Sequence, residues 1–159
     1  MRKINDTQKS YIAGFLDGDG SVYVRLKKNE TYKYGYQIAP YITLYQKEKY
    51  INFLKSIRDL LGIGYVRSRK DGVSEYIIGD EKSLIDFSKE ITPFSKLKKQ
   101  QLRLLSSVIK LKSKTKNAKD FIALCEKIDR FKELNYSKKR TQDSKEVSRY
   151  LIRKNLLTP

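Results

Sequence analysis

Two segments near the start of the chain alternate between apolar and polar side chains, and this period constrains the fold more than any other feature. In SVYVRLK, residues 21–27, and in YQIAPYITLYQ, residues 36–46, aliphatic side chains recur at every second position. Because successive side chains of a strand point to opposite faces, this pattern is typical of a sheet with one buried and one open face. Two shorter strands are predicted around residues 64–69 and 73–78, joined by a turn that ends at Gly72.

Most of the remaining segments carry apolar residues at helical spacing. A helix is predicted from about Thr7 to Asp17, and others over residues 47–62, over residues 80–91 and in the C-terminal third. The elements therefore follow the order αββαββα, with helices appended. We predict an α+β fold in which a four-stranded antiparallel sheet is covered by helices on its apolar face.

The length of 159 residues suits a single domain. Within it we expect a flexible tail over residues 1–6, the αββαββα core over residues 7–112, and a C-terminal helical extension over residues 113–159. Asp143 and Glu146 form a capping pair that is predicted to open the last helix.

The charge of the chain is far from neutral. It has 35 Lys and Arg residues against 18 Asp and Glu residues, a formal net charge of +17, which favours a polyanionic partner such as nucleic acid. Basic and hydrogen-bonding side chains, with tyrosines among them, are predicted on the open sheet face: Arg25, Lys27, Gln37, Thr43, Arg67, Arg69, Tyr23 and Tyr41. A β-ribbon can present such side chains to base edges in the major groove of DNA. We find no apolar run long enough to span a bilayer, so no membrane partner is expected.

The cysteine and histidine content excludes several chemistries. Cys125 is the only cysteine, and its helical spacing from Leu124 and Ile128 predicts a buried structural thiol. No disulfide can form within the chain, which fits an intracellular compartment. Since the sequence contains no histidine, a hydrolytic site must use carboxylate, lysine or metal-bound water.

The acidic segment DGDGS, residues 17–21, follows the first predicted helix and calls for an explanation. A calcium-binding loop would need glycine and glutamate where the chain has Val22 and Lys28. An ordinary helix end explains Gly18 and Gly20, but aspartates at a helix C-terminus face the negative end of the helix dipole. The two aspartates therefore indicate a cation or another functional use.

Small residues on the first helix suggest what that use is. Ala13, Gly14 and Gly18 would let a second helix backbone approach closely, with Gly14 and Gly18 four residues apart on one face. If the partner is the same helix of a second chain, twofold symmetry places two acidic helix ends side by side. Two carboxylates together with phosphates and water make a reasonable magnesium site.

The stretch YIAGFLDGDG resembles the signature of the LAGLIDADG homing endonucleases. The similarity extends over roughly residues 9–140 and includes the order of helices and strands, GIGYVRSR in the third strand, and PFSKLKKQQ before the following helix. A single copy of the motif is similar to the homodimeric branch of the family. The resemblance implies a twofold dimer assembled through the motif helix, with Ala13, Gly14, Asp17 and Gly18 at or near the contact.

The resemblance also implies roles for individual residues. Asp19 and the carbonyl group of Gly18 would bind the divalent ion, Mg²⁺ with Mn²⁺ as a substitute, and Asp17 would cap and pack the helix end. Gln46 would orient the attacking water, and Lys98 would stabilise negative charge.

Two neighbourhoods of these residues carry further expectations. Lys96, Lys98 and Lys99 are predicted in the first turn of a helix, where the dipole disfavours cations, so a nearby anion such as phosphate is expected. The family places an arginine four residues after the glutamine, where this chain has Tyr50 beside Lys49. Tyr50 also falls on the predicted apolar stripe of its helix, so which of the two residues replaces the arginine stays open.

Base-contacting positions of the family lie on the open sheet face. By register they correspond to Arg25, Lys27, Asn29, Tyr32, Gln37, Thr43, Arg67, Arg69 and Glu75, while Ser137, Lys138 and Lys139 resemble a phosphate-contacting loop. Arginine suits guanine, glutamine suits adenine and glutamate can accept a hydrogen bond from cytosine.

The implied function is a homing endonuclease that makes a double-strand break with 3′ overhangs in a long pseudo-palindromic DNA site and so promotes intron mobility. No small-molecule substrate is expected. If the source is eukaryotic, the enzyme would be made inside a chloroplast or mitochondrion. Two alternatives stay open: an RNA maturase that aids intron splicing, and a catalytically silent sequence-specific DNA-binding protein.

Overall fold

The computed structural model describes residues 1–135 and 142–157. Where the sequence predicted one domain, the chain divides into two compact units. The first comprises residues 1–23 and 40–106, and the second residues 24–39 and 107–159. Residues of the first two strands and of the long fourth helix belong to both units.

The predicted α+β fold with a four-stranded antiparallel sheet is confirmed. The strands are β1 (Gly20–Lys28), β2 (Tyr36–Lys47), β3 (Tyr65–Ser68) and β4 (Val73–Ile78), in the spatial order β1-β2-β4-β3. The β3–β4 turn closes at Gly72, whose φ of 76° lies in the left-handed region that glycine adopts without strain. Across β2 and β4 the register places Tyr45 opposite Glu75.

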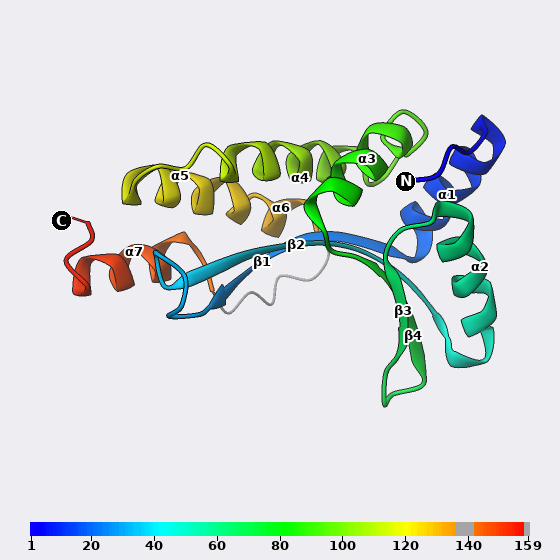
Figure 1. Cartoon of the computed structure of the whole chain (residues 1–159), viewed down its shortest axis with the longest axis horizontal. Helices are drawn as coiled ribbons and strands as arrows, with labels where there is room; N and C mark the ends of the chain where they lie inside the picture. The colour runs from blue at the N-terminus through cyan, green and yellow to red at the C-terminus, as the bar shows by residue number, and fades with distance from the viewer. Residues whose placement is uncertain (136–141, 158–159) are drawn as a thin grey trace. The chain divides into compact units, whose positions relative to one another are not determined.

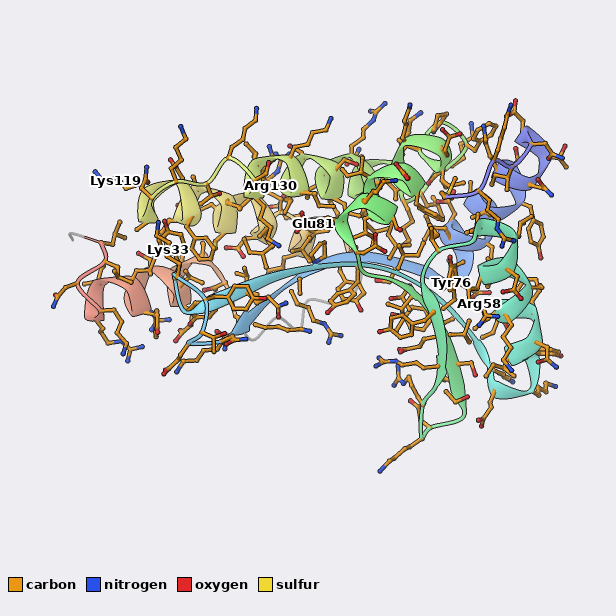
Figure 2. The ribbon with its side chains drawn as sticks, in the orientation of Figure 1. Lys33, Arg58, Tyr76, Glu81, Lys119 and Arg130 are labelled. Atoms are coloured by element: carbon orange, nitrogen blue, oxygen red, sulfur yellow. The ribbon has the colours of Figure 1, made fainter. Side chains whose placement is uncertain are left out.

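Helices cover the apolar face of the sheet in the first unit. They are α1 (Asp6–Asp19), α2 (Ile51–Leu61) with the 3₁₀ turn η1 (Glu48–Tyr50) before it, α3 (Glu81–Ile91) and the start of α4 (Lys99–Lys112). Helix α1 packs beside α3, and α2 packs on β3 and β4. Figure 2 shows Tyr76 between β4 and α2, where its hydroxyl donates a hydrogen bond to the carbonyl oxygen of Ile63 at 2.8 Å.

The core of this unit follows the predicted alternation. Val22 on β1, together with Ile42 and Leu44 on β2, is at most 1% exposed. The residues that fill the space under the helices include Ile12, Leu16, Leu54, Leu61, Leu84, Phe87, Ile91 and Leu102, all fully buried. Gly62, with a φ of 67°, ends α2 as the sequence predicted.

The first residues do not form the flexible tail that the sequence predicted. Asn5 caps α1, because its side chain accepts a hydrogen bond from the backbone of Gln8 while the Gln8 side chain accepts one from the backbone of Asn5. The backbone N–H of Arg2 donates to Leu61 at 2.8 Å, and Ile4 is buried. The reason is local, since Asn and Gln three residues apart satisfy helix-end donors that would otherwise stay unpaired.

The second unit contains the β1–β2 hairpin tip, α5 (Ala118–Asp129), α6 (Phe131–Leu134) and α7 (Ser144–Arg153). Aromatic pairs tie the hairpin to its helices: Tyr34 stacks on Phe121 at 4.7 Å, and Tyr36 meets Tyr150 edge-on at 5.4 Å between ring centroids. Cys125 is fully buried, as the sequence predicted.

The start of α7 also agrees with its sequence signal. The Asp143 carboxylate accepts a hydrogen bond from the backbone N–H of Glu146 at 2.9 Å. Among residues 1–135 and 142–157, no helix is both long enough and apolar enough to cross a membrane.

Candidate active site and nucleic-acid interface

Asp19 and Gln46 lie together although they are far apart in the sequence. Asp19 is the last residue of α1, which leads directly into β1 (Figure 1), and its carboxylate is exposed. Gln46, near the end of β2, donates a hydrogen bond from Nε2 to Asp19 Oδ2 at 3.2 Å. The resemblance implied that Asp19 binds the divalent ion and that Gln46 orients the attacking water, and the fold brings these two side chains into contact. Within the described part of the chain, no group of three or more Asp, Glu, Cys or His side chains forms a metal cluster.

Asp17 has a different environment from Asp19. Its carboxylate accepts a hydrogen bond from Ser95 Oγ at 2.6 Å and from the backbone N–H groups of Lys96 at 2.7 Å and Lys98 at 3.0 Å. Three donors on one carboxylate fix the segment 95–98 against the end of α1. Asp17 lies two residues before Asp19 on α1, so its hydrogen bond holds the backbone of Lys98 near the end of that helix. Lys98 itself is buried, with 7% of its surface exposed.

The lysines of this segment lie differently from the prediction. Helix α4 begins at Lys99, so Lys96 and Lys98 precede it rather than forming its first turn. The anion that their backbone N–H groups contact is the carboxylate of Asp17, within the same chain. Leu97, between these two lysines, is 65% exposed.

The pKa of Asp17 is lowered from its ordinary value of 3.8. Partial burial would raise this pKa, but the hydrogen bonds from Ser95, Lys96, Lys98 and Leu97 favour the charged form and outweigh burial. A carboxyl group with a lowered pKa stabilises the folded state above its unfolded pKa, and this contribution disappears as the pH falls through the folded pKa.

We therefore expect Asp17→Asn to lower the free energy of unfolding by about 1–3 kcal/mol at neutral pH, because an amide nitrogen would face backbone donors. The difference from the wild type should shrink as the pH falls below 3.8 and through the lowered pKa of Asp17. Urea unfolding of both proteins between pH 7 and pH 3 measures it. Asp19→Asn, which changes an exposed carboxylate, is the matched control. A pH-independent difference between Asp17→Asn and the wild type would contradict this role.

Tyr50 does not lie on the apolar stripe of α2 as predicted. It belongs to the 3₁₀ turn that precedes α2, and its side chain is 50% exposed. The tighter 3₁₀ turn changes the phase of the side chains, so the stripe begins later in the helix. The Lys49 ammonium lies 4.9 Å from the centroid of the Tyr50 ring, so the two candidates for the missing arginine contact each other.

One face of α1 is open. A Cβ atom built on Gly14 or on Gly18 would meet no other atom within 4 Å, and both residues are exposed. Tyr11, one turn earlier, is 55% exposed and packs edge-on against Phe53 at 6.4 Å. The sequence reasoning missed Tyr11, although its helical spacing from Gly14 and Gly18 places it on the same face.

Two residues that the sequence grouped with this face have other neighbours. Ala13 is fully buried inside its own chain. Asp17 is half-buried and holds the segment before α4. The open face of α1 is therefore narrower than predicted and centres on its two glycines.

On β3 and β4, three residues predicted to read bases form one ion-paired cluster. Arg67 contacts Glu75 Oε2 through Nε at 2.7 Å and Nη2 at 2.6 Å, and Arg69 Nη1 contacts Glu75 Oε1 at 3.3 Å. Glu75 is only 5% exposed. Its hydrogen bonds raise the pKa of both guanidinium groups. In the free chain the Glu75 carboxylate binds the two arginines and is not presented to cytosine. The exposed side chains of this cluster are those of Arg67 and Arg69.

The other predicted base contacts fall into several classes. Thr43 is buried with 1% exposed, and its hydroxyl has no hydrogen-bond partner among the described residues. It therefore does not present itself at the open face, contrary to the prediction. Asn29 Oδ1 accepts hydrogen bonds from the backbone N–H and the hydroxyl of Thr31, while Tyr32 is 41% exposed.

The remaining members divide between exposed, half-buried and undescribed positions. Arg25 is exposed, and Lys27 and Gln37 are half-buried, all within the second unit. The predicted phosphate-contacting residues Ser137, Lys138 and Lys139 lie outside the described residues.

An antiparallel sheet with an arginine-bearing face, preceded by a helix that ends in an exposed carboxylate, fits the family that the signature YIAGFLDGDG resembles. The chain belongs to the LAGLIDADG endonucleases, whose sequence profile matches residues 12–96. It is 37% identical over 146 residues to DNA endonuclease I-CreI of Chlamydomonas reinhardtii, covering 91% of this chain and 89% of that protein. It is also 31% identical over 132 residues to DNA endonuclease I-CvuI of Chlorella vulgaris, covering 83% and 82%.

Solved structures of I-CvuI have the same fold. One, in complex with the I-CreI target and 2 mM Mg with the DNA not cleaved, gives a TM-score of 0.91 at 28% identity over 96% of this chain and 97% of that one. Another, with its own target and 2 mM Ca, gives a TM-score of 0.90 at 28% identity over 97% and 100%.

Proposed function

We propose that the protein is a homodimeric, divalent-metal-dependent, site-specific DNA endonuclease. The observation that carries the proposal is the contact between Asp19 and Gln46 at the exposed end of α1, next to the open face at Gly14 and Gly18. Pairing of two α1 helices through this face would bring the Asp19 carboxylates of both chains together. A single chain supplies half of such a site.

The donor atoms at the end of α1 fit a divalent ion. The carboxylate of Asp19 and the backbone carbonyl of Gly18 are hard oxygen ligands of the kind that Mg²⁺ prefers, and Mn²⁺ accepts the same set. The exposure of Asp19 leaves its carboxylate accessible. When bound, the ion supplies Lewis-acid stabilisation of the negative charge that develops on a scissile phosphate.

The chain's own residues orient the reactants. Gln46 donates a hydrogen bond from Nε2 to Asp19, and this bond fixes the plane of the Gln46 amide. The Oε1 atom of Gln46 is then available to accept a hydrogen bond from the attacking water. Lys98 is the last residue of the segment that Asp17 anchors, and its ammonium group stabilises charge on the phosphate and the leaving oxygen. Lys49 and Tyr50, in contact with each other, are proposed to organise water where the family has an arginine.

The DNA partner is proposed from the sheet and the charge. The open face presents Arg67 and Arg69 from the first unit, and the exposed Arg25 comes from the second. With a formal charge of +17, the protein is expected to bind double-stranded DNA in the major groove with strong salt dependence. The related I-CreI and I-CvuI are named DNA endonucleases, and I-CvuI was solved with target DNA.

The proposed product is a double-strand break with 3′ overhangs in a long pseudo-palindromic site, which promotes intron mobility. The lone, buried Cys125 supports an intracellular place of action. Translation within a chloroplast or mitochondrion is part of the same proposal and follows from the family resemblance.

The test is cleavage of a pool of duplexes carrying randomised pseudo-palindromes, in Mg²⁺ and in EDTA, with the new ends sequenced. We expect ends with 3′ overhangs that map to one symmetric motif, in Mg²⁺ only. A motif that is bound but never cut would replace this proposal with a silent DNA-binding protein. Failure to bind any duplex, with binding to folded intron RNA, would replace it with a maturase.

A further inference from the structure

Tyr23 and Tyr41 form a stacked pair on the open face of the sheet. Their ring centroids are 5.5 Å apart and the ring planes are inclined by 36°. Tyr41 also lies against Gly79 at the end of β4, where an added Cβ would stand 3.2 and 3.3 Å from two ring carbons. The Tyr41 ring is therefore enclosed between Tyr23 and a backbone that lacks a side chain, which fixes its position.

The neighbours of the pair show which face it occupies. Val22 and Val24, on either side of Tyr23 in β1, are buried with 0% and 4% exposed, so Tyr23 points to the opposite, open face. Tyr41 shares its face of β2 with Thr43, which is 1% exposed. Since Tyr23 and Tyr41 are half-buried and Thr43 is covered, phenol rings rather than the threonine hydroxyl form the accessible surface here.

The same open face carries the charged cluster of Arg67, Arg69 and Glu75. Glu75, opposite Tyr45 in the register, holds Arg67 and Arg69. The pKa of Arg67 is raised, mainly by its hydrogen bond to Glu75. The part of the open face that belongs to the first unit therefore carries both guanidinium groups, from Arg67 and Arg69, and phenol rings, from Tyr23 and Tyr41.

The position of the pair relative to Asp19 follows from strand geometry. Tyr23 comes four residues after Asp19, along β1. At about 3.3 Å per residue this is about 13 Å, which corresponds to about four base pairs of duplex.

We propose that Tyr23 and Tyr41 form an apolar reading surface that selects thymine through its C5-methyl group, about four base pairs from the cleaved phosphate. The proposal rests on the proposed function and deepens it. Thymine carries the methyl group that the major-groove edges of the other bases lack, and a ring face attracts that group without needing a bidentate hydrogen bond. Tyrosine rings held by stacking offer this contact at little entropic cost.

The experiment uses the target selected from the duplex pool. Each thymine of the half-site is replaced in turn by deoxyuridine, which removes the methyl group and keeps every base-pairing atom. We expect cleavage at limiting enzyme to fall about fourfold for thymine within about three to five base pairs of the cut. Uracil at positions facing the arginine cluster is the control and should change cleavage less.

Two variants identify the residues responsible. In Tyr41→Phe the ring remains, so the thymine-to-uracil difference should persist. In Tyr41→Ser the ring is lost, so the wild-type and uracil substrates should be cut equally. Gly79→Ala should reduce the difference by displacing the Tyr41 ring. Thermal unfolding confirms that each variant is folded. If Tyr41→Ser does not fold, the uracil series on Gly79→Ala decides, because that change displaces the Tyr41 ring without removing it, and an effect as large as in the wild type would overturn the role of the pair.

The outcomes separate this inference from the proposed function. A selected motif that lacks thymine in this window overturns the inference and leaves the endonuclease intact, and so does a motif whose cleavage ignores uracil there. A uracil effect that is equal in the wild type and in Tyr41→Ser overturns the role of the pair. If no DNA motif is selected at all, both fail together.

Discussion

Replacing Asp19 with asparagine is expected to leave target binding nearly unchanged and to slow cleavage by more than about a hundredfold. Asparagine has the shape of aspartate, and its Oδ1 can still accept the hydrogen bond that Gln46 Nε2 donates at 3.2 Å in the wild type. The geometry at the end of α1 therefore stays, while the charge that holds a divalent ion is lost. Because the formal charge rises from +17 to +18, affinity for DNA should not fall.

Single-turnover cleavage of the selected target across a Mg²⁺ titration measures the first effect, and binding to the same duplex in EDTA measures the second. Gln46→Glu is a useful companion variant, because it keeps the size of the side chain but places a second carboxylate beside Asp19. It should weaken cleavage by replacing a donor with a repelling charge. Wild-type cleavage rates for Asp19→Asn would show that the metal site and the chemistry lie elsewhere.

Local sequence patterns predicted the elements of the fold because each element depends on its own residues. The period-two segment of β1 buries Val22 and Val24, as expected for a half-buried strand. Gly62 and Gly72 end a helix and close a turn because both adopt a positive φ. For such features the chain needs no partner segment, so the sequence alone is sufficient.

Contacts between distant segments were harder to predict. The resemblance implied that Asp17 caps and packs the helix end, but nothing local indicates that the donors to its carboxylate are Ser95 Oγ and the backbone N–H groups of Lys96 and Lys98, which lie 78 or more residues away in the sequence. Thr43 has the same alternating position as its half-buried neighbours Tyr41 and Tyr45 on β2, yet it is fully covered, because burial depends on how large the surrounding side chains are. The residue type of Thr43 and the alternation of the strand do not predict the size of the side chains around it.

The site shows the same division. The resemblance to a family located Asp19 and Gln46, and the fold joins them at 3.2 Å. Glu75 was predicted as a base contact from its register on the open sheet face, and in the structure it is 5% exposed and holds Arg67 and Arg69. The pairing of β3 with β4 sets Arg67 directly opposite Glu75, so this one of its two arginine partners could have been anticipated.

The second large effect concerns Gly14. Gly14→Leu is expected to give a folded monomer that does not make double-strand breaks. A Cβ at this position meets no atom within 4 Å in the single chain, and the residue lies inside α1. Replacing a helix-interior glycine should therefore leave the chain's own stability unchanged or raise it by up to about 1 kcal/mol. A leucine side chain would, however, separate two helices that approach through their glycines.

Light scattering gives the oligomeric state, thermal unfolding the stability and the selected duplex the cleavage rate. Ala123→Leu is the matched control, because Ala123 is an exposed small residue on α5 and the change adds the same apolar side chain to another helix. That control should remain dimeric and active. Because one chain contributes one Asp19, loss of the dimer and loss of cleavage should occur together. A Gly14→Leu protein that stays dimeric and cuts at the wild-type rate would show that the open face of α1 is not where two chains meet.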